Sequence, residues 1–247
     1  MNIDRKYIYK EETASTNSDL KELIKSSPCP EYTVIRAKKQ SGGRGRLGRS
    51  FHSPAGGLYF SAAFPLTGEE KLVPALTLLT GLFVCETVEE LCEAAPSVKW
   101  PNDIFLNGRK LCGILCELTG GKYPTVIAGI GINLSTAEKD IPRELTDIMT
   151  SLSIENAALP DPEVFMRTVI GKLDRAVYDE KTLCSDVIPE KYIEKLRARS
   201  YLTGKEVKYR TAEKELRGVF SDISDAGEAV IDTGKEEIRI FCGEITI

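Results

Sequence analysis

The chain has 247 residues, of which 42% are hydrophobic and 28% charged, and its formal net charge is −4. This balance supports a sizeable core and excludes a disordered chain, a collagen-like repeat and a disulfide-stabilised miniprotein. The longest uncharged apolar stretch, Leu72–Cys85, is shorter than the roughly 20 residues of a membrane-spanning helix. The N-terminal residues contain no apolar signal core, so we expect a cytoplasmic protein without membrane association.

Helices and strands are both predicted along the first 200 residues. Ser15–Asp19 can cap an amphipathic helix, and Asp161 followed by Pro162 predicts the start of another. Asn107-Gly108 is typical of a type I′ hairpin turn, so the strands around it should form an antiparallel meander. The other predicted elements are strands at Thr33–Ala37 and Leu58–Phe64, three strands between Val98 and Asn133, and helices at Leu72–Leu91 and Pro189–Arg199.

The predicted secondary structure changes after about Tyr201. Four short strands separated by turns are predicted there, at Lys205–Arg210, Glu215–Ile223, Glu228–Asp232 and Ile238–Cys242. This spacing indicates a small β-barrel module. We therefore expect an α+β domain over residues 1–200, with a mixed, largely antiparallel sheet flanked by helices, and a C-terminal module over residues 201–247.

Positive charge is concentrated in one segment of an acidic chain. No carboxylate occurs between Tyr32 and Gly68, where six basic residues give a local charge of +6 against a net charge of −4. A broad nucleic-acid-binding face would spread its positive charge more widely. The distribution favours one anionic ligand held at one place.

The centre of this segment is a glycine-rich loop, Gln40–Arg49, with the sequence QSGGRGRLGR. It fits the G-x-G-x-x-G dinucleotide pattern, but Pro54 and Gly56-Gly57 prevent the helix that the pattern requires. Glycines expose backbone N–H groups, and arginine side chains bind carboxylate and phosphate bidentately. Anion binding is therefore favoured over the alternative of a solvated basic surface loop.

A second motif, Lys99–Asp103, contains the only tryptophan and is followed by Arg109-Lys110. Pro101 cannot donate to a strand ladder, so we expect a kink at a strand edge or bulge. The hairpin turn should bring Lys110 back towards Asn102 and Asp103. The alternative, in which Asp103 only caps a turn and Lys110 is a surface charge, has about equal support from spacing alone.

Three further features complete the candidate chemistry. Gly129–Asn133 ends a strand with paired glycines that permit close approach of a ligand, although a plain strand end would look similar. His52 is the only histidine, which nearly excludes Ser-His-Asp and Cys-His mechanisms and two-histidine metal sites. The seven cysteines form no C-x-x-C pair, and Cys112 and Cys116 fit small reduced core residues.

Taken together and in chain order, the motifs resemble the biotin–protein ligase family. They are Ser15-Thr16-Asn17, the glycine-rich loop, Lys99–Asp103 with Arg109-Lys110, Gly129–Asn133 and the closing Gly243-Glu244-Ile245. The resemblance covers nearly the whole chain. It implies a catalytic biotin- and ATP-binding domain followed by an SH3-like β-barrel. It also implies two steps: biotin and ATP give biotinyl-5′-adenylate, and a lysine of a biotin carboxyl carrier domain then accepts the acyl group.

The resemblance also implies roles for individual residues. The implied catalytic residues are Lys110, Arg46, Arg49 and Asp103, with Asp103 orienting the lysine amine or assisting its deprotonation. The implied biotin-binding residues are Ser15, Thr16, Asn17, Gln40, Gly43, Arg44, Gly45, Arg46, Lys110 and Gly113. The implied nucleotide-binding residues are Arg44, Arg46, Arg49, Trp100, Asn102, Lys110 and Asn133. Magnesium is the implied cofactor, held by Asn102 and Asn133.

Leu47 and Phe51 depart from the pattern of some relatives, which have arginine and tryptophan there, and we expect changed binding strength but the same reaction. Other relatives have an N-terminal helix-turn-helix domain, and too few residues precede Ser15 for one here, so we expect no DNA binding. A homodimer is one expected assembly. The alternatives are a lipoate or octanoate ligase or transferase on a similar scaffold and, with less support, a non-catalytic nucleic-acid-binding protein.

Overall fold

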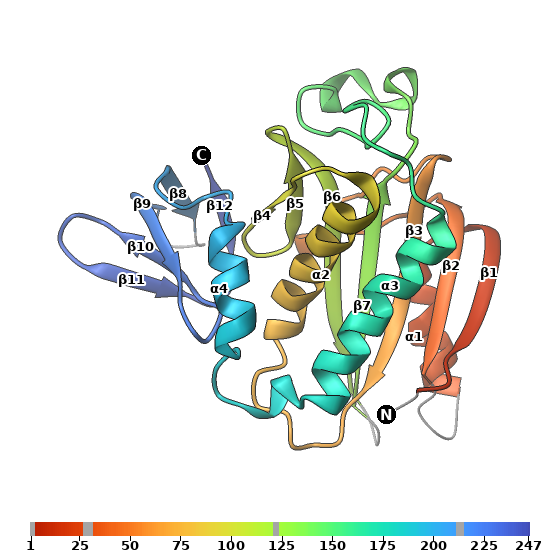
Figure 1. Cartoon of the computed structure of the whole chain (residues 1–247), viewed down its shortest axis with the longest axis horizontal. Helices are drawn as coiled ribbons and strands as arrows, with labels where there is room; N and C mark the ends of the chain where they lie inside the picture. Colours follow the sequence, from red (N-terminus) through yellow and green to blue (C-terminus); the bar gives the residue numbers. More distant parts are fainter. Residues whose placement is uncertain (1–2, 27–31, 121–123, 211–214) are drawn as a thin grey trace.

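The computed structural model describes residues 3–26, 32–120, 124–210 and 215–247. These residues form a seven-stranded sheet, packed between helices, and a separate five-stranded sheet near the C-terminus (Figure 1). Within the described ranges, no helix is both long and apolar enough to span a bilayer.

The seven-stranded sheet has the strand order β1-β2-β3-β7-β6-β5-β4. Its β1 and β2 are parallel, and every other neighbouring pair is antiparallel. The predicted mixed, largely antiparallel sheet is therefore confirmed. The strands are β1 (Lys6–Thr13), β2 (Thr33–Gln40), β3 (Gly57–Pro65), β4 (Ser97–Lys99), β5 (Asp103–Leu106), β6 (Arg109–Thr119) and β7 (Thr125–Asn133).

Helices cover both faces of this sheet, because alternate side chains of its strands point to opposite sides. Phe60, Ala62 and Phe64 of β3 belong to the large core beneath α2 (Ala75–Cys92) and α3 (Pro162–Asp174). Ala63 points the other way and packs with Leu20 of α1 (Thr16–Ser26). Figure 1 shows α2 and α3 together on one face. On the opposite face, α1 therefore covers only part of the sheet, and the uncovered part is open to a ligand.

The helix boundaries follow the predicted signals. The Asp161 side chain accepts hydrogen bonds from the backbone of Glu163 and Val164, and Pro162 occupies the first turn of α3, as its residue types predict. The helix α2 begins at Ala75 rather than Leu72. A π-helical turn, Arg175–Asp179, extends α3, and short 3₁₀ turns occupy Arg46–Gly48, Glu138–Asp140, Arg143–Leu145 and Thr182–Cys184.

The C-terminal residues form an antiparallel sheet with the order β11-β10-β9-β8-β12. It follows α4 (Glu190–Ala198), which contacts β9. The four predicted strands are confirmed, β9 with the predicted bounds and the other three with shifted ends, and a fifth, β12, was not expected. The strands are β8 (Glu206–Arg210), β9 (Glu215–Ile223), β10 (Ala229–Asp232), β11 (Glu237–Ile240) and β12 (Glu244–Thr246).

Two other strands escaped the sequence-based predictions. β1 is an edge strand with mostly exposed or half-exposed side chains, so it lacks the apolar alternation that identifies a strand. The segment from residue 97 to 133 contains four strands rather than three, because β4 pairs with β5 through the turn at residues 100–102. Pro101 thus lies in a turn between two strands and not at a bulge within one.

Candidate functional site

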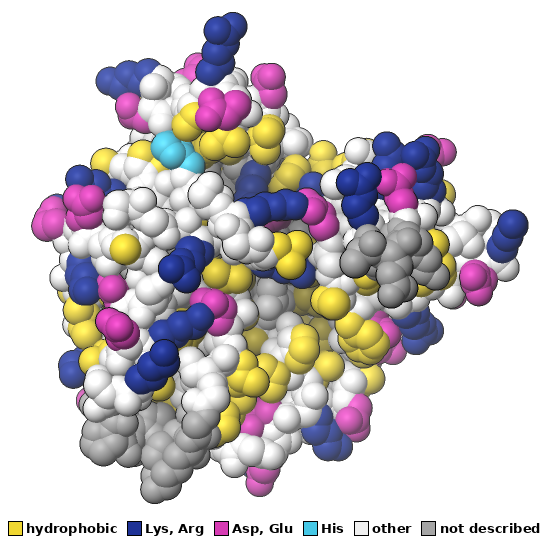
Figure 2. Space-filling view, turned by 180° about the vertical axis from the view of Figure 1, so that it is seen from behind, with side chains coloured by type: hydrophobic (Ala, Val, Ile, Leu, Met, Phe, Trp, Pro, Cys, Tyr) yellow, Lys and Arg dark blue, Asp and Glu magenta, His cyan; other side chains and the backbone are white. Residues whose placement is uncertain are grey.

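A cavity opens on the face of the large sheet that α2 and α3 leave uncovered. Viewed from that side, basic side chains gather around a hollow near the middle of the molecule (Figure 2). The cavity is bordered by the start of α1, the glycine-rich loop, the turn between β4 and β5, the strands β6 and β7, and residues 243–245. Segments from the whole length of the chain therefore meet at one place.

Glycines form the floor of the cavity where β6 and β7 pair. Gly113 lies opposite Gly131 in the ladder, and a Cβ atom at either position would lie within 3 Å of the Phe51 ring. A Cβ atom at Gly129 would lie 2.1 Å from Oδ1 of Asn17. The missing side chains therefore let Phe51 and Asn17 lie directly on the sheet.

The start of α1 presents a hydrogen-bonded polar group at one end of the cavity. Ser15, Thr16 and Asn17 are all buried. The Thr16 backbone N–H donates to Oε1 of Gln40 at 2.9 Å, and Gln40 Nε2 donates to Ser53 Oγ at 3.0 Å. These bonds fix the orientation of the Gln40 amide, and selective recognition of a ligand requires such a fixed polar group.

Asn17 is held equally firmly. Its Nδ2 donates to the Leu115 carbonyl at 3.2 Å and to Glu117 Oε2 at 2.8 Å, and the Ser61 hydroxyl lies 2.5 Å from its Oδ1. Ser61 is fully buried on β3 and also contacts Thr16 Oγ1 at 2.7 Å. Ser61 and Glu117 thus orient the polar end of the cavity. Neither was predicted, because nothing in the sequence connects them with Asn17.

The glycine-rich loop folds back on itself above the floor. Gly45 N–H donates to the Arg49 carbonyl at 2.7 Å, and Arg44 pairs with Ser50 in a single bridge. Leu47 adopts a left-handed conformation (φ 56°) at the tip and is 77% exposed. The loop therefore places its three arginines around the cavity and leaves its apolar tip in solvent.

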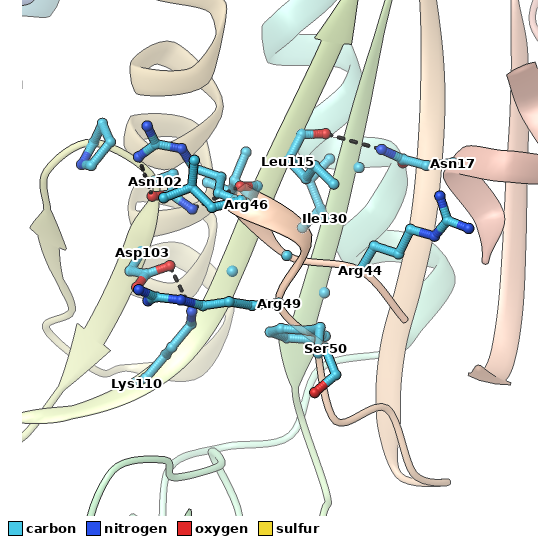
Figure 3. Close-up of a pocket in the computed structure, with 18 of the residues that line it drawn as sticks. Asn17, Arg44, Arg46, Arg49, Ser50, Asn102, Asp103, Lys110, Leu115 and Ile130 are labelled. Carbon is cyan, nitrogen blue, oxygen red and sulfur yellow. Dashed lines mark hydrogen bonds and ion pairs between the residues drawn. The ribbon is translucent and has the colours of Figure 1, made fainter. Parts of the chain in front are cut away.

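The turn after β4 and the hairpin after β5 supply the opposite end. Arg46 Nη1 donates to Asn102 Oδ1 at 3.2 Å, and Asn102 Nδ2 donates to the Ile114 carbonyl at 3.0 Å. Lys110 Nζ lies 2.7 Å from Asp103 Oδ1 and 5.6 Å from the centre of the Phe51 ring. Figure 3 shows the Arg46–Asn102 and Asp103–Lys110 contacts, with Arg49 extending towards the Asp103–Lys110 pair. The spacing left two alternatives open, and the structure decides between them: amide, carboxylate and ammonium meet at the cavity and are not unrelated surface groups.

Lys99 is an additional cation of the cavity that was not among the residues predicted for the site. It lines the cavity, and its ammonium lies 5.0 Å from the centre of the Phe105 ring. Burial lowers the pKa of Lys99 below its usual value, and the neighbouring Lys110 acts in the same direction. An anionic ligand at this place would act in the opposite direction and raise the pKa of Lys99.

Most of the residues predicted for the site line this one cavity. Trp100 does so with its ring buried, and its Nε1 donates to the Gly227 carbonyl at 3.0 Å, which connects the cavity wall to the C-terminal sheet. The predicted residues around the cavity are Ser15, Thr16, Asn17, Gln40, Arg44, Gly45, Arg46, Arg49, Trp100, Asn102, Asp103, Lys110 and Gly113.

Two predicted residues lie elsewhere. Gly43 is packed beneath the loop, where a Cβ atom would lie 2.5 Å from the Phe51 carbonyl oxygen. Asn133 is buried at the end of β7, outside the cavity lining, and its Nδ2 donates to the Thr150 carbonyl at 2.9 Å. Its Oδ1 is buried without a hydrogen-bond partner in the described part of the chain.

Comparison with known proteins agrees with the resemblance. A model of the biotin/lipoate A/B protein ligase family matches residues 9–133. The chain belongs to this family. It is 32% identical to the bifunctional ligase/repressor BirA of Bacillus subtilis, with 97% of this chain and 73% of that protein covered. It is 28% identical to a biotin–[acetyl-CoA-carboxylase] ligase of Mycobacterium tuberculosis, with 95% and 86% covered.

A solved structure extends the agreement to the whole fold. The biotin protein ligase from Aquifex aeolicus in complex with biotin and ATP superposes with a TM-score of 0.81 at 32% identity, covering 98% of this chain and 97% of that one. The match includes both sheets of the present chain. The family fold predicted for this sequence is therefore confirmed.

Proposed function

We propose that this chain is an ATP-dependent biotin–protein ligase that joins biotin to a lysine of a biotin carboxyl carrier domain through biotinyl-5′-adenylate. The family membership and the biotin- and ATP-bound relative support this assignment. The observation that carries it is a single cavity with a fixed polar end, at Asn17 and Gln40, and a cationic end, at Arg46 and Lys110.

In the first step, a carboxylate oxygen of biotin attacks the α-phosphorus of ATP, the bond to the β-phosphate oxygen breaks, and pyrophosphate leaves. Both reactants are anions, so the reaction needs positive charge fixed around them before they meet. Arg46, Arg49 and Lys110 line the cavity and supply it. Gln40 and Asn17 bind the polar ring of biotin at the other end, so that its carboxylate faces the cations.

In the second step, the ε-amine of the acceptor lysine attacks the acyl carbon of the adenylate. An amide bond forms, the bond to the phosphate oxygen breaks, and AMP leaves with the electron pair. Asp103 lies at the cationic end, 2.7 Å from Lys110 Nζ. It is placed to orient the incoming amine or to accept its proton.

The mixed anhydride must be protected from water between the two steps. The glycine-rich loop borders the cavity, and its glycines permit it to close over the adenylate. Leu47 is exposed at the tip and provides an apolar surface for this closure. The departure at Leu47 therefore affects how tightly the loop covers the intermediate and not which bonds are made.

The residues predicted to hold magnesium do not form one cation site. Asn102 Oδ1 already accepts a hydrogen bond from Arg46, and Asn133 does not line the cavity. Within the described ranges, no cluster of three or more His, Cys, Asp or Glu side chains could hold a metal ion. Asn102 and Asn133 thus do not fit the predicted role, and no step of the mechanism is assigned to magnesium.

The assignment is tested by incubating the purified chain with ATP and a biotin carboxyl carrier domain, together with biotin, lipoate or octanoate in separate reactions. We expect pyrophosphate release and modification of the acceptor lysine with biotin alone. Transfer of lipoate or octanoate, with no transfer of biotin, would show that the chain is instead a lipoate or octanoate ligase or transferase. Salt-dependent binding of duplex DNA without adenylation would instead support a non-catalytic nucleic-acid-binding protein.

The cellular location and the assembly stay predictions. We expect a cytoplasmic enzyme, which fractionation of expressing cells tests. A homodimer is tested by sedimentation of the chain with and without biotin and ATP.

A further inference from the structure

Arg49 and Glu244 form an ion pair between segments that are 195 residues apart in sequence. Arg49 Nη1 donates to Glu244 Oε1 at 2.6 Å, and Nη2 donates to Oε2, so the contact is bidentate. Arg49 belongs to the glycine-rich loop, whereas Glu244 is the first residue of β12 in the C-terminal sheet. The pair therefore connects the proposed nucleotide-binding loop to the C-terminal sheet.

The backbone around Glu244 is fixed by its neighbours. Ile245 is 3% exposed and anchors β12 in the core, and Glu244 pairs with Arg210 of β8. Gly243 has a φ of 129°, and a Cβ atom there would lie 2.3 Å from the Tyr209 ring. Only glycine fits this close turn, which directs β12 along the wall of the cavity. The carboxylate thus reaches Arg49 from a rigid element.

The contact leaves hydrogen-bonding capacity on Arg49. A guanidinium group has five N–H donors, and the bidentate contact uses one donor on each terminal nitrogen. The side chain is 62% exposed and extends towards Asp103 and Lys110 (Figure 3). Three donors therefore remain for an anion at the cationic end of the cavity.

The local charges favour this arrangement. Asp103 and Glu244 are the two carboxylates among the described cavity-lining residues, and each is paired with a different cation. The hydrogen bond from Arg49 lowers the pKa of Glu244, and the positive charges of Arg49, Lys99 and Arg46 act in the same direction. Glu244 is consequently ionised at neutral pH and remains a hydrogen-bond acceptor for Arg49.

We propose that Glu244 is a positioning residue for adenylation, which holds the Arg49 guanidinium at the cavity with its remaining donors directed at the nucleotide phosphates. The proposal rests on the ligase function proposed above. It makes the C-terminal sheet part of the nucleotide site, although Glu244 itself need not touch the nucleotide. A carboxylate that instead competed with the phosphates for Arg49 would have the opposite effect on nucleotide binding.

The test measures biotin-dependent pyrophosphate release for Glu244→Ala, Glu244→Gln, Arg49→Ala and the Arg49→Ala/Glu244→Ala double variant. For Glu244→Ala we expect the KM for ATP to rise about tenfold while the Kd for biotin alone is unchanged, because Arg49 loses its fixed orientation. Glu244→Gln should be intermediate, since its amide oxygen accepts one hydrogen bond. In the Arg49→Ala background, removal of Glu244 should have no further effect.

Glu237→Ala is the matched control. Glu237 is an exposed carboxylate of β11, at the opposite edge of the same sheet from β12. Its removal should leave the KM for ATP unchanged.

A lower KM for ATP in Glu244→Ala would overturn the proposal in favour of competition, and additive losses in the double variant would indicate a merely structural role. An unchanged KM for ATP in Glu244→Ala would also overturn it. Absence of pyrophosphate release by the unmodified chain would instead refute the ligase function.

Discussion

Lys110 Nζ lies 2.7 Å from Asp103 Oδ1, across the hairpin that connects β5 to β6. Asn107 and Gly108 form the turn, with φ values of 50° and 82°, as a type I′ turn requires. The turn therefore returns the chain so that ammonium and carboxylate meet at the cavity. The pairing orients the Lys110 side chain at the cavity before the substrate arrives.

The first prediction concerns the charge of Lys110. Lys110→Ala should lower the rate of biotin-dependent pyrophosphate release by about 100-fold or more, because a fixed positive charge next to the developing anhydride is lost. The matched control is Lys71→Ala, which removes an exposed lysine paired with Asp186 away from the cavity. An unchanged rate in Lys110→Ala would remove Lys110 from the mechanism.

The second prediction concerns the glycine floor. In Gly129→Ala the new Cβ atom would collide with Asn17, whose hydrogen bonds to Leu115 and Glu117 would be displaced. We expect the Kd for biotin, measured by calorimetry, to rise at least about tenfold, since the loss of one hydrogen-bonding group costs about 1.5 kcal/mol.

Gly171→Ala is the control for the glycine substitution. A Cβ atom at Gly171, in α3, meets no atom within 4 Å. This variant should bind biotin normally and be up to about 1 kcal/mol more stable, because alanine is the better helix former. Normal biotin binding by Gly129→Ala would contradict the proposed position of the ring.

The third prediction concerns the connection between the two sheets. Trp100→Phe retains an aromatic ring but leaves the Gly227 carbonyl without its indole donor. Because an unpaired acceptor is costly even where it is only half-buried, the free energy of unfolding in urea should fall by about 1–2 kcal/mol. An unchanged stability would mean that solvent replaces this hydrogen bond without cost.

The fourth prediction concerns acid stability. Partial burial alone would raise the pKa of Glu86, but the hydrogen bond from Lys195 and the nearby charges of Lys172 and Lys195 outweigh it and lower the pKa below 4.5. This pairing therefore contributes fully above pH 4.5, and its contribution is lost as the pH falls through the lower folded-state pKa.

The variant Glu86→Gln isolates this effect. It should reduce the free energy of unfolding by about 1 kcal/mol at pH 7 and by less at pH 3, because the carboxylate of the unfolded chain takes up its proton below pH 4.5 and the charge-dependent contribution then declines. Chemical denaturation at the two pH values measures the difference. An equal loss at both values would show that the contribution of Glu86 does not depend on its charge.

Much of the local architecture was predictable because its causes are local. The residue types at Asp161–Pro162 and Asn107–Gly108 favour a helix start and a hairpin turn wherever they occur. The apolar side chains of α2 identify a buried helix, and the short strands after Tyr201 identify the second sheet. β1 and β12 were not found, since a polar edge strand and a three-residue strand have no distinctive periodicity.

By itself, the sequence determined that a glycine-rich, positively charged loop occurs in an acidic chain and that a tight turn at Asn107-Gly108 reverses the chain between Asp103 and Lys110, because backbone turns and charge spacing act over a few residues. Only the tertiary structure decided that Glu244 pairs with Arg49, that Trp100 is bonded to Gly227, and that Asn133 points to Thr150 and away from the cavity. Those contacts depend on how sheets and loops pack, and neighbouring residue types do not specify the packing of distant segments.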